Sequence, residues 1–298
     1  MVCIDDGSND GTQELLRCLA LEANPKVFIA KHIANSGPSH ARNIGIDLSN
    51  GRYVTFVDSD DFVSNDFVSK IVEALKTNKP DMLVFGYSCL SEENDCISDQ
   101  FSNFNDSHDQ LFLDGKGFVR EYLYGLDPLG GCTWGKVVSL SLLKDKEIYF
   151  AEDIRYHEDA LFWTQISQYV NKVVSIQDNL YCYKTFGLSR LSGSSCVDID
   201  LEAVLGLKRI AEIIDRFYPE YSTMAWGRCR YSCAMALMHN VECRGSAGYI
   251  QLMQLSKSMH SKDISSLPMM ARYKILFIDF AIKVDPAVLQ MLLKLRKG

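Results

Sequence analysis

Short apolar segments alternate with helix-like segments along the first 87 residues, and this alternation limits the possible folds more than any other feature. The apolar segments have the length of strands, and the segments between them repeat apolar residues at helical spacing. Strands that alternate with helices predict a mostly parallel sheet covered by helices on both faces. The predicted strands are 2–4, 27–30, 53–57 and 82–87, and the predicted helices are 12–23, 39–48 and 66–76.

The pattern changes after residue 88. A polar, acidic stretch over 91–109 lacks clear periodicity and fits either a loop or a pair of exposed strands. From residue 198 onward, apolar residues recur at helical spacing. A boundary near 190–197 therefore predicts one domain over 1–190 and a helical region over 191–298. The elements expected between these stretches are helices over 117–124 and 159–169 and strands over 173–176 and 180–183.

Composition excludes several classes of protein. The net charge of −7 over 298 residues argues against nonspecific binding to nucleic acid, which requires a basic surface. The ten cysteines form no C-x-x-C pair, so no zinc finger is predicted. The sequence has no signal peptide and no apolar run near the ~18 residues that a membrane-spanning helix requires. We therefore expect a cytoplasmic protein.

Acidic residues follow two of the predicted strands. Asp5 and Asp6 follow the first strand, and a run of Asp58, Ser59, Asp60 and Asp61 follows the strand over 53–57. Ligands of open α/β sheets bind beyond the carboxyl ends of the strands. Carboxylates crowded there fit Mg²⁺ or Mn²⁺ shared with substrate phosphates. A solvated loop in which Asp58 or Asp61 caps the next helix is the alternative.

Two other metal-related hypotheses account for the same residues less well. The segment "DGSNDGTQELLR" imitates the first half of a calcium-binding EF-hand loop, but Arg17 stands where the loop requires Glu. The segment "FVDSDD" also resembles the strand end of haloacid-dehalogenase-like phosphatases, in which the first Asp is a nucleophile. The Asp61-Phe62 pair does not match that motif.

Two further groups of polar residues stand at predicted helix starts. Arg42 and Asn43 can bind a diphosphate or the edge of a base, although Arg42 can equally form a surface ion pair. Glu158 and Asp159 begin the helix expected over 159–169. The two acids fit either a favourable charge at a helix N-terminus or a general base, and the residues alone leave both possibilities open.

Together these segments resemble the family 2 glycosyltransferases of the GT-A fold. The matching segments occur in the family's order and cover roughly residues 2–190. The subset they resemble most consists of bacterial enzymes that build capsule, exopolysaccharide or lipopolysaccharide. The segments are "VCIDDGSNDGT", "NSGPSHARNIGI", "GRYVTFVDSDD", "WGK" and "YHEDALFW".

The resemblance implies an α/β GT-A fold with a Rossmann-like mixed sheet and a role for each matching residue. Asp5, Asp6, Arg42, Asn43, Asp58 and Ser59 would bind the nucleotide-sugar, and Asp60 with Asp58 would hold Mn²⁺ or Mg²⁺. Asp159 would deprotonate the acceptor hydroxyl beside Glu158, and Trp134 with Lys136 would line the acceptor side.

The resemblance also implies a reaction and its partners. A sugar would pass from a nucleotide-diphosphate sugar, with UDP as the expected nucleotide, to a glycan or lipid-linked acceptor with inversion. Inversion requires a base on the acceptor side and charge stabilisation on the leaving-group side. The C-terminal segments "MARYKILFIDFAIKV" and "MLLKLRKG" mix apolar and basic residues, so peripheral membrane contact is a further expectation. Ordinary core helices with basic flanks account for them equally well.

The chain departs from the family at its start. The family's domain begins with a strand that ends in a P-x-Y-N-like motif, followed by a helix, and this unit does not precede Val2. We therefore expect an open sheet flank beside the first predicted strand. A late start codon, a truncated gene or a different source of that edge would each account for the departure. The alternative function is that of an inactive remnant that acts as an interaction protein.

Overall fold

The computed structural model describes residues 1–24, 28–91, 94–100, 111–123, 131–184 and 197–284. The chain divides into two compact units. The first comprises residues 1–153 and 158–187, and the second comprises residues 154–157 and 188–298. The predicted domain boundary near 190 falls outside the described residues.

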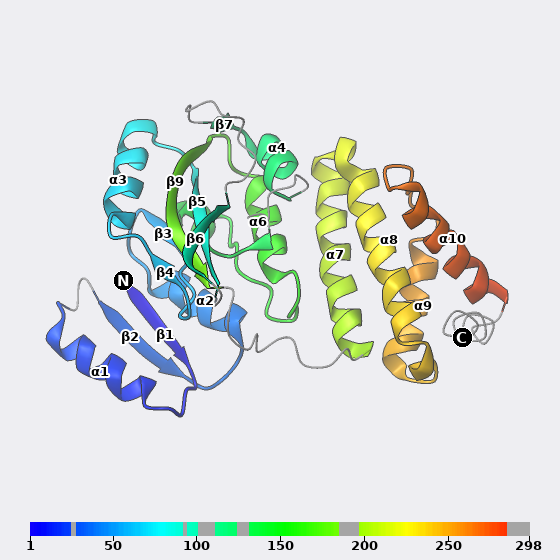
Figure 1. Cartoon of the computed structure of the whole chain (residues 1–298), viewed down its shortest axis with the longest axis horizontal. Coiled ribbons are helices and arrows are strands. Elements are labelled where there is room, and N and C mark those ends of the chain that lie inside the picture. Colours follow the sequence, from blue (N-terminus) through cyan, green and yellow to red (C-terminus); the bar gives the residue numbers. More distant parts are fainter. Residues whose placement is uncertain (25–27, 92–93, 101–110, 124–130, 185–196, 285–298) are drawn as a thin grey trace. The chain divides into compact units, whose positions relative to one another are not determined.

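A small parallel sheet opens the first unit (Figure 1). Strand β1 (Val2–Asp6) pairs in parallel with β2 (Ile29–Ile33), and α1 (Thr12–Glu22) connects them. Helix α2 (Pro38–Leu48) follows and packs on β1. Pro38 occupies the first turn of α2, where its missing N–H costs no hydrogen bond. The helices predicted over 12–23 and 39–48 are thus confirmed.

A second sheet of seven strands, counted over the described residues, forms the centre of this unit. Among the described strands of this sheet, β5–β9 is the only parallel pair, so the prediction of a mostly parallel sheet is wrong. The reason is β8, which inserts between β3 and β5 and runs antiparallel to both. The strand order is β3 (Tyr53–Thr55), β8 (Lys136–Ser139), β5 (Met82–Ser91), β9 (Val173–Lys184) and β4 (Phe62–Val63), with β6 (Asn94–Gln100) on β5 and β7 (Leu111–Leu113) on β9.

Strand β9 replaces the two strands predicted over 173–176 and 180–183. Its pairing with β5 shifts register at Gly86, which lies opposite Asn179 after Phe85 has paired with Ile176. The two extra residues on β9 form a bulge, which bends a strand without ending it. A Cβ atom at Gly86 would lie 2.4 Å from Asn179 Oδ1 and 3.2 Å from the Asp178 carbonyl oxygen, so the close approach of β9 favours glycine at this bulge.

Helices cover the seven-stranded sheet and complete the core. α3 (Phe67–Asn78) lies against β5 and β9 (Figure 1). Helix α6 (Glu158–Ser167) buries Phe162, whose ring stacks on Phe150 with centroids 3.8 Å apart. The helix predicted over 117–124 begins as α4 (Gly115–Phe118) and continues as a π-helical turn over Val119–Leu123. The short α5 (Leu140–Asp145) follows β8.

The second unit is helical, as predicted. Its helices are α7 (Val197–Phe217), α8 (Ser222–His239), α9 (Ala247–Ser258) and α10 (Met269–Val284), with 3₁₀ turns at Pro219–Tyr221 and Val241–Cys243. α8 packs on the other three helices (Figure 1). Among the described residues, no helix is long and apolar enough to cross a membrane.

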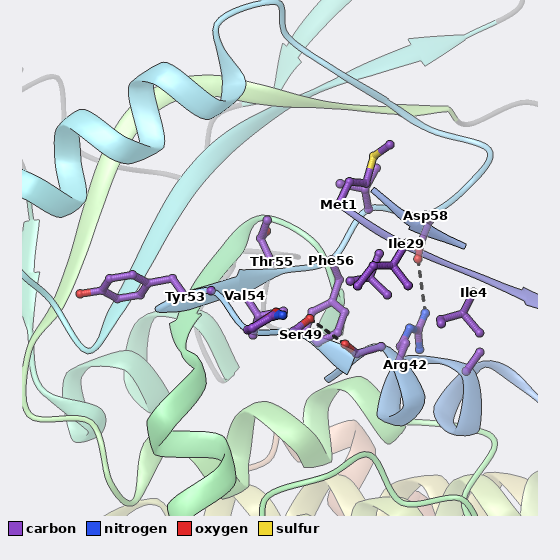
Figure 2. Close-up of a pocket in the computed structure, with 16 residues that line it drawn as sticks. Met1, Ile4, Ile29, Arg42, Ser49, Tyr53, Val54, Thr55, Phe56 and Asp58 are labelled. Atoms are coloured by element: carbon purple, nitrogen blue, oxygen red, sulfur yellow. Dashed lines mark hydrogen bonds and ion pairs between the residues drawn. The ribbon is translucent and has the colours of Figure 1, made fainter. Parts of the chain in front are cut away.

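A pocket of about 640 Å³ separates β1 from β3. Figure 2 shows apolar side chains around it, including Ile4 and Ile29 from the small sheet and Val54 and Phe56 from the end of β3. Within the described residues, β1 pairs only with β2 and β3 only with β8. Among these residues, each strand therefore presents one unpaired edge beside this pocket, and the expected open flank is present.

Filling this pocket with a strand should stabilise the first unit. We expect a strand of β1's length, fused ahead of Met1 through a connection of about a dozen residues, to pair with the open edge of β1. The new hydrogen bonds and buried apolar surface should raise the midpoint of thermal unfolding by several degrees. The matched control carries proline in the fused strand, which removes a ladder donor. Equal midpoints for the two fusions would contradict the prediction.

Candidate active site

Arg42 joins three segments that are far apart in the sequence. Its guanidinium lies 3.4 Å from the Asp58 carboxylate through Nη2 and 3.4 Å from the Glu158 carboxylate through Nη1. Figure 2 shows the first of these interactions at the rim of the pocket beside β1. The ring of Phe150 lies 5.4 Å from the guanidinium carbon and adds a cation–π contact. The predicted nucleotide, metal and base segments therefore meet at one arginine.

The carboxylates of the acidic loop after β3 differ from one another in burial and in their partners. Burial raises the pKa of Asp58, while the positive charge of Arg42 lowers it. Ser59 and Asp60 are exposed, and Asp60 makes no hydrogen bond or ion pair with any described residue. One carboxylate is thus held by the protein, and the next is available to an external ligand.

A hydrogen-bonded clamp fixes this loop, and the sequence did not reveal it. The Tyr181 hydroxyl donates to Asp61 Oδ2 at 2.6 Å and accepts from the Asp58 N–H at 3.2 Å. The Lys184 N–H donates to Asp61 Oδ1 at 2.8 Å. Asp61 and Tyr181 therefore attach the loop to β9. Tyr181 stands in an apolar strand pattern, which indicates burial but not a use for the hydroxyl.

Trp134 lies behind this clamp. Its ring stacks on Tyr181 with centroids 4.6 Å apart and on Tyr183 with centroids 5.5 Å apart, and only 4% of Trp134 is exposed. In this structure Trp134 is thus part of the aromatic core. Its predicted contact with an acceptor sugar stays a prediction.

The two carboxyl groups at the start of α6, those of Glu158 and Asp159, have different surroundings. Burial, followed by the repulsion of Asp159, raises the pKa of Glu158 to about 8, against a smaller opposing effect of Arg42. Burial and the neighbouring carboxylate thus favour the protonated form of Glu158. Asp159 Oδ2 accepts a hydrogen bond from the Thr133 hydroxyl at 3.1 Å, which orients that carboxylate. Thr133 is a second residue that the sequence did not single out.

The two acids at the end of β1 brace neighbouring loops. Asp5 is buried and accepts from the Ser8 N–H at 3.0 Å, and its other oxygen lies 2.7 Å from His32 Nδ1. Hydrogen bonds from the Ser8 hydroxyl, from His32 and from the Ser8 N–H hold the pKa of Asp5 below its usual value. Asp6 accepts from the N–H groups of Ser36 and Gly37 at 2.8 and 2.9 Å. The nucleotide contacts predicted for both acids stay predictions.

Asn43 and Lys136 are also engaged within the protein. Asn43 exchanges hydrogen bonds with the backbone of Phe150 at 2.8 and 3.0 Å and donates to Glu152 at 2.9 Å. The fully buried Lys136 donates to the Cys132 carbonyl at 2.8 Å and to the Trp134 carbonyl at 3.3 Å. Both residues hold the backbone around the site, and their predicted ligand contacts stay predictions.

The residues present fit a divalent cation that also binds a ligand's phosphates. The described residues contain no group of three or more His, Cys, Asp or Glu side chains that could hold a metal alone. Mg²⁺ commonly uses one or two carboxylates and takes its remaining oxygens from water and phosphate. Asp58 and the unpaired Asp60 supply this number of carboxylates.

The fold is that of GT-A type glycosyltransferase structures. The crystal structure of Staphylococcus aureus TarS 1–349 in complex with UDP matches with a TM-score of 0.59 at 19% identity, over 95% of this chain and 81% of that chain. The complex with UDP-GlcNAc matches with a TM-score of 0.55 at 16% identity, over 88% of this chain and 82% of that chain.

Sequence comparisons agree with the fold. Residues 1–118 match the family model "Glycosyl transferase family 2". Poly(ribitol-phosphate) beta-N-acetylglucosaminyltransferase TarS of Staphylococcus aureus (strain Mu50) is 24% identical over 235 residues, which are 73% of this chain and 38% of TarS. Glycosyltransferase GlyA of Streptococcus pneumoniae serotype 4 is 26% identical over 188 residues, which are 62% of this chain and 26% of GlyA.

The N-terminal part of the chain, residues 1–118, is therefore similar to the glycosyltransferases of family 2. The matched segments span well under half the length of TarS and GlyA, the curated relatives described above.

Removing the Tyr181 hydroxyl should loosen the acidic loop. In Tyr181→Phe, the Asp58 N–H and the Asp61 carboxylate each lose a hydrogen-bond partner. We expect a loss of roughly 1–3 kcal/mol in the free energy of unfolding, measured with urea. Tyr183→Phe is the matched control, because it also keeps an aromatic ring against Trp134. Equal losses in the two variants would argue against the clamp.

Glu158 should make the protein less stable as pH rises. Between pH 4.5, the usual pKa, and about 8, the folded state keeps a proton that the unfolded chain has released. Unfolding therefore becomes easier across this window. Glu158→Gln should flatten this dependence and raise stability at the upper end of the window by on the order of 1–3 kcal/mol. The measurement is urea unfolding at several pH values, with Glu73→Gln on the exposed face of α3 as control. An unchanged slope in Glu158→Gln would refute the assignment.

Proposed function

We propose that this chain transfers a sugar from a UDP-sugar to a hydroxyl of a glycan or lipid-linked acceptor, with inversion, in the synthesis of a cell-surface polysaccharide. The observation that carries the proposal is the bridge of Arg42 between Asp58 and Glu158. It places an acidic loop suited to a diphosphate beside a carboxylate pair suited to proton transfer. The TarS complexes with UDP and UDP-GlcNAc support the choice of donor class.

The donor side of the proposed site is the loop after β3. Asp58 and Asp60 would hold Mg²⁺ or Mn²⁺, which when bound would stabilise the negative charge of the leaving diphosphate. Asp61 and Tyr181 keep the backbone of this loop in one conformation. Arg42 adds a fixed positive charge on the same side, where a diphosphate would otherwise meet only acids.

The acceptor side is the pair at the start of α6. A general base must be ionised and within reach of the hydroxyl that it deprotonates. Glu158 holds a proton at neutral pH, so we assign the base to Asp159. The Thr133 hydroxyl orients the Asp159 carboxylate, and the protonated Glu158 limits the negative charge beside it. The base and the leaving group then act from separate elements, as a single inverting displacement requires.

Two separate substitutions should affect UDP binding and the chemical step of sugar transfer independently. Asp159→Asn should keep metal-dependent binding of UDP and lower kcat with a UDP-sugar by about 10²-fold or more, because it removes the base. Asp60→Ala should instead weaken UDP binding and abolish its dependence on Mn²⁺. Binding is measured by calorimetry with UDP and Mn²⁺, and turnover is measured as release of UDP.

The exposed Asp145 provides the control, because Asp145→Ala removes a carboxylate of the same unit outside the site. A chain that binds no UDP with Mn²⁺, and whose cellular role survives both Asp60→Ala and Asp159→Asn, would instead act as an interaction protein. That result would overturn the proposed transfer.

A further inference from the structure

A buried ion pair fixes the rotation of α10 about its own axis. Asp279 lies on α10 with 9% of its surface exposed, and its Oδ2 is 2.7 Å from Arg230 Nη2 on α8. His260 Nδ1 lies 3.1 Å from the same oxygen, and the Ser256 hydroxyl lies 3.3 Å from Oδ1. A charge buried this deeply is costly to separate from its partner, so this face of α10 must point inward.

The opposite face of α10 is apolar and exposed. Ile275 and Ile278 lie on the inward face with Asp279 and are buried. The outward residues recur at the spacing of one helical face and are between 42% and 69% exposed. A contiguous apolar patch of this kind marks an interaction site. We call it the outer stripe; its residues are Met269, Met270, Tyr273, Leu276, Phe277 and Phe280.

Charge distinguishes this segment from the rest of the chain. Residues 269–298 contain six Lys or Arg and two Asp, a net charge of +4. The whole chain carries −7, so residues 1–268 carry −11. The only acid in α10 is Asp279, which is buried and paired. The apolar stripe thus belongs to the cationic C-terminal part of an acidic chain.

We propose that the outer stripe of α10 binds the surface of an anionic lipid bilayer. Helices with aromatic and aliphatic residues on one face and basic residues nearby lie in the interface of such bilayers. Each nearby Lys or Arg strengthens attraction to anionic lipid, whereas the acidic remainder of the chain is repelled. A second copy fits less well, because pairing two stripes about a two-fold axis brings two cationic segments together.

Vesicle binding by the full chain tests the proposal. We expect the chain to sediment with vesicles of phosphatidylcholine and phosphatidylglycerol and to remain unbound with phosphatidylcholine alone. Raising the salt concentration should release it, because the attraction is partly electrostatic. Leu276→Glu combined with Phe280→Glu should weaken binding by about tenfold or more, since it places two acids on the stripe.

The control places the same two charges elsewhere on the helical unit. Phe217 and Ile250 are 45% and 42% exposed, and their double substitution by Glu should leave vesicle binding unchanged. No binding by the full chain, or equal loss in both double variants, would overturn the proposal. A dimer in sedimentation velocity that Leu276→Glu with Phe280→Glu dissociates, without vesicle binding, would also overturn it. The lipid and salt dependence of the unaltered chain decides the matter even if a variant fails to fold.

Discussion

The arrangement of the candidate site depends on one cation held between two acids. Arg42 reaches Asp58 in the loop after β3 and Glu158 at the start of α6, two acids separated by 100 residues. Its side chain is only 18% exposed, so these charges interact with less screening than on an open surface. Without it, the two acidic segments would repel each other across the site, and no other described contact bridges them directly.

Two further layers of contacts hold the ends of this bridge. Tyr181 and Asp61 anchor the loop that carries Asp58, and the stacked ring of Trp134 supports Tyr181 in turn. Asn43 holds the segment around Phe150, whose ring contacts Arg42. Several residues that the resemblance assigns to ligands therefore also have a positioning role. A side chain that positions a site and one that contacts a ligand carry the same sequence signal.

Local periodicity predicted most elements of the first 87 residues because each strand and helix there buries one regular face. The sheet order was not predictable in this way. β8 inserts between β3 and β5 although it begins 81 residues after β3 ends and 45 residues after β5 ends, and nothing in its own sequence indicates those partners. The acids, Arg42 and the Glu158–Asp159 pair were found from their motifs. Tyr181 and Thr133 were missed because a single hydroxyl in an apolar or polar run has no pattern.

The charges around Arg42 divide the site into two unequal sides. Because burial and Asp159 favour the protonated form of Glu158, the positive charge of Arg42 is directed mainly to Asp58. The loop after β3 still has the carboxylate of Asp60, which pairs with no described residue, so under the proposed function this side would hold a cation and, through it, phosphate. The start of α6 keeps one ionised carboxylate, oriented by Thr133. A single proton on Glu158 thus makes the two sides of the site different. The loop after β3 is suited to holding charge, and the start of α6 is suited to accepting a proton. One-step transfer with inversion requires this difference.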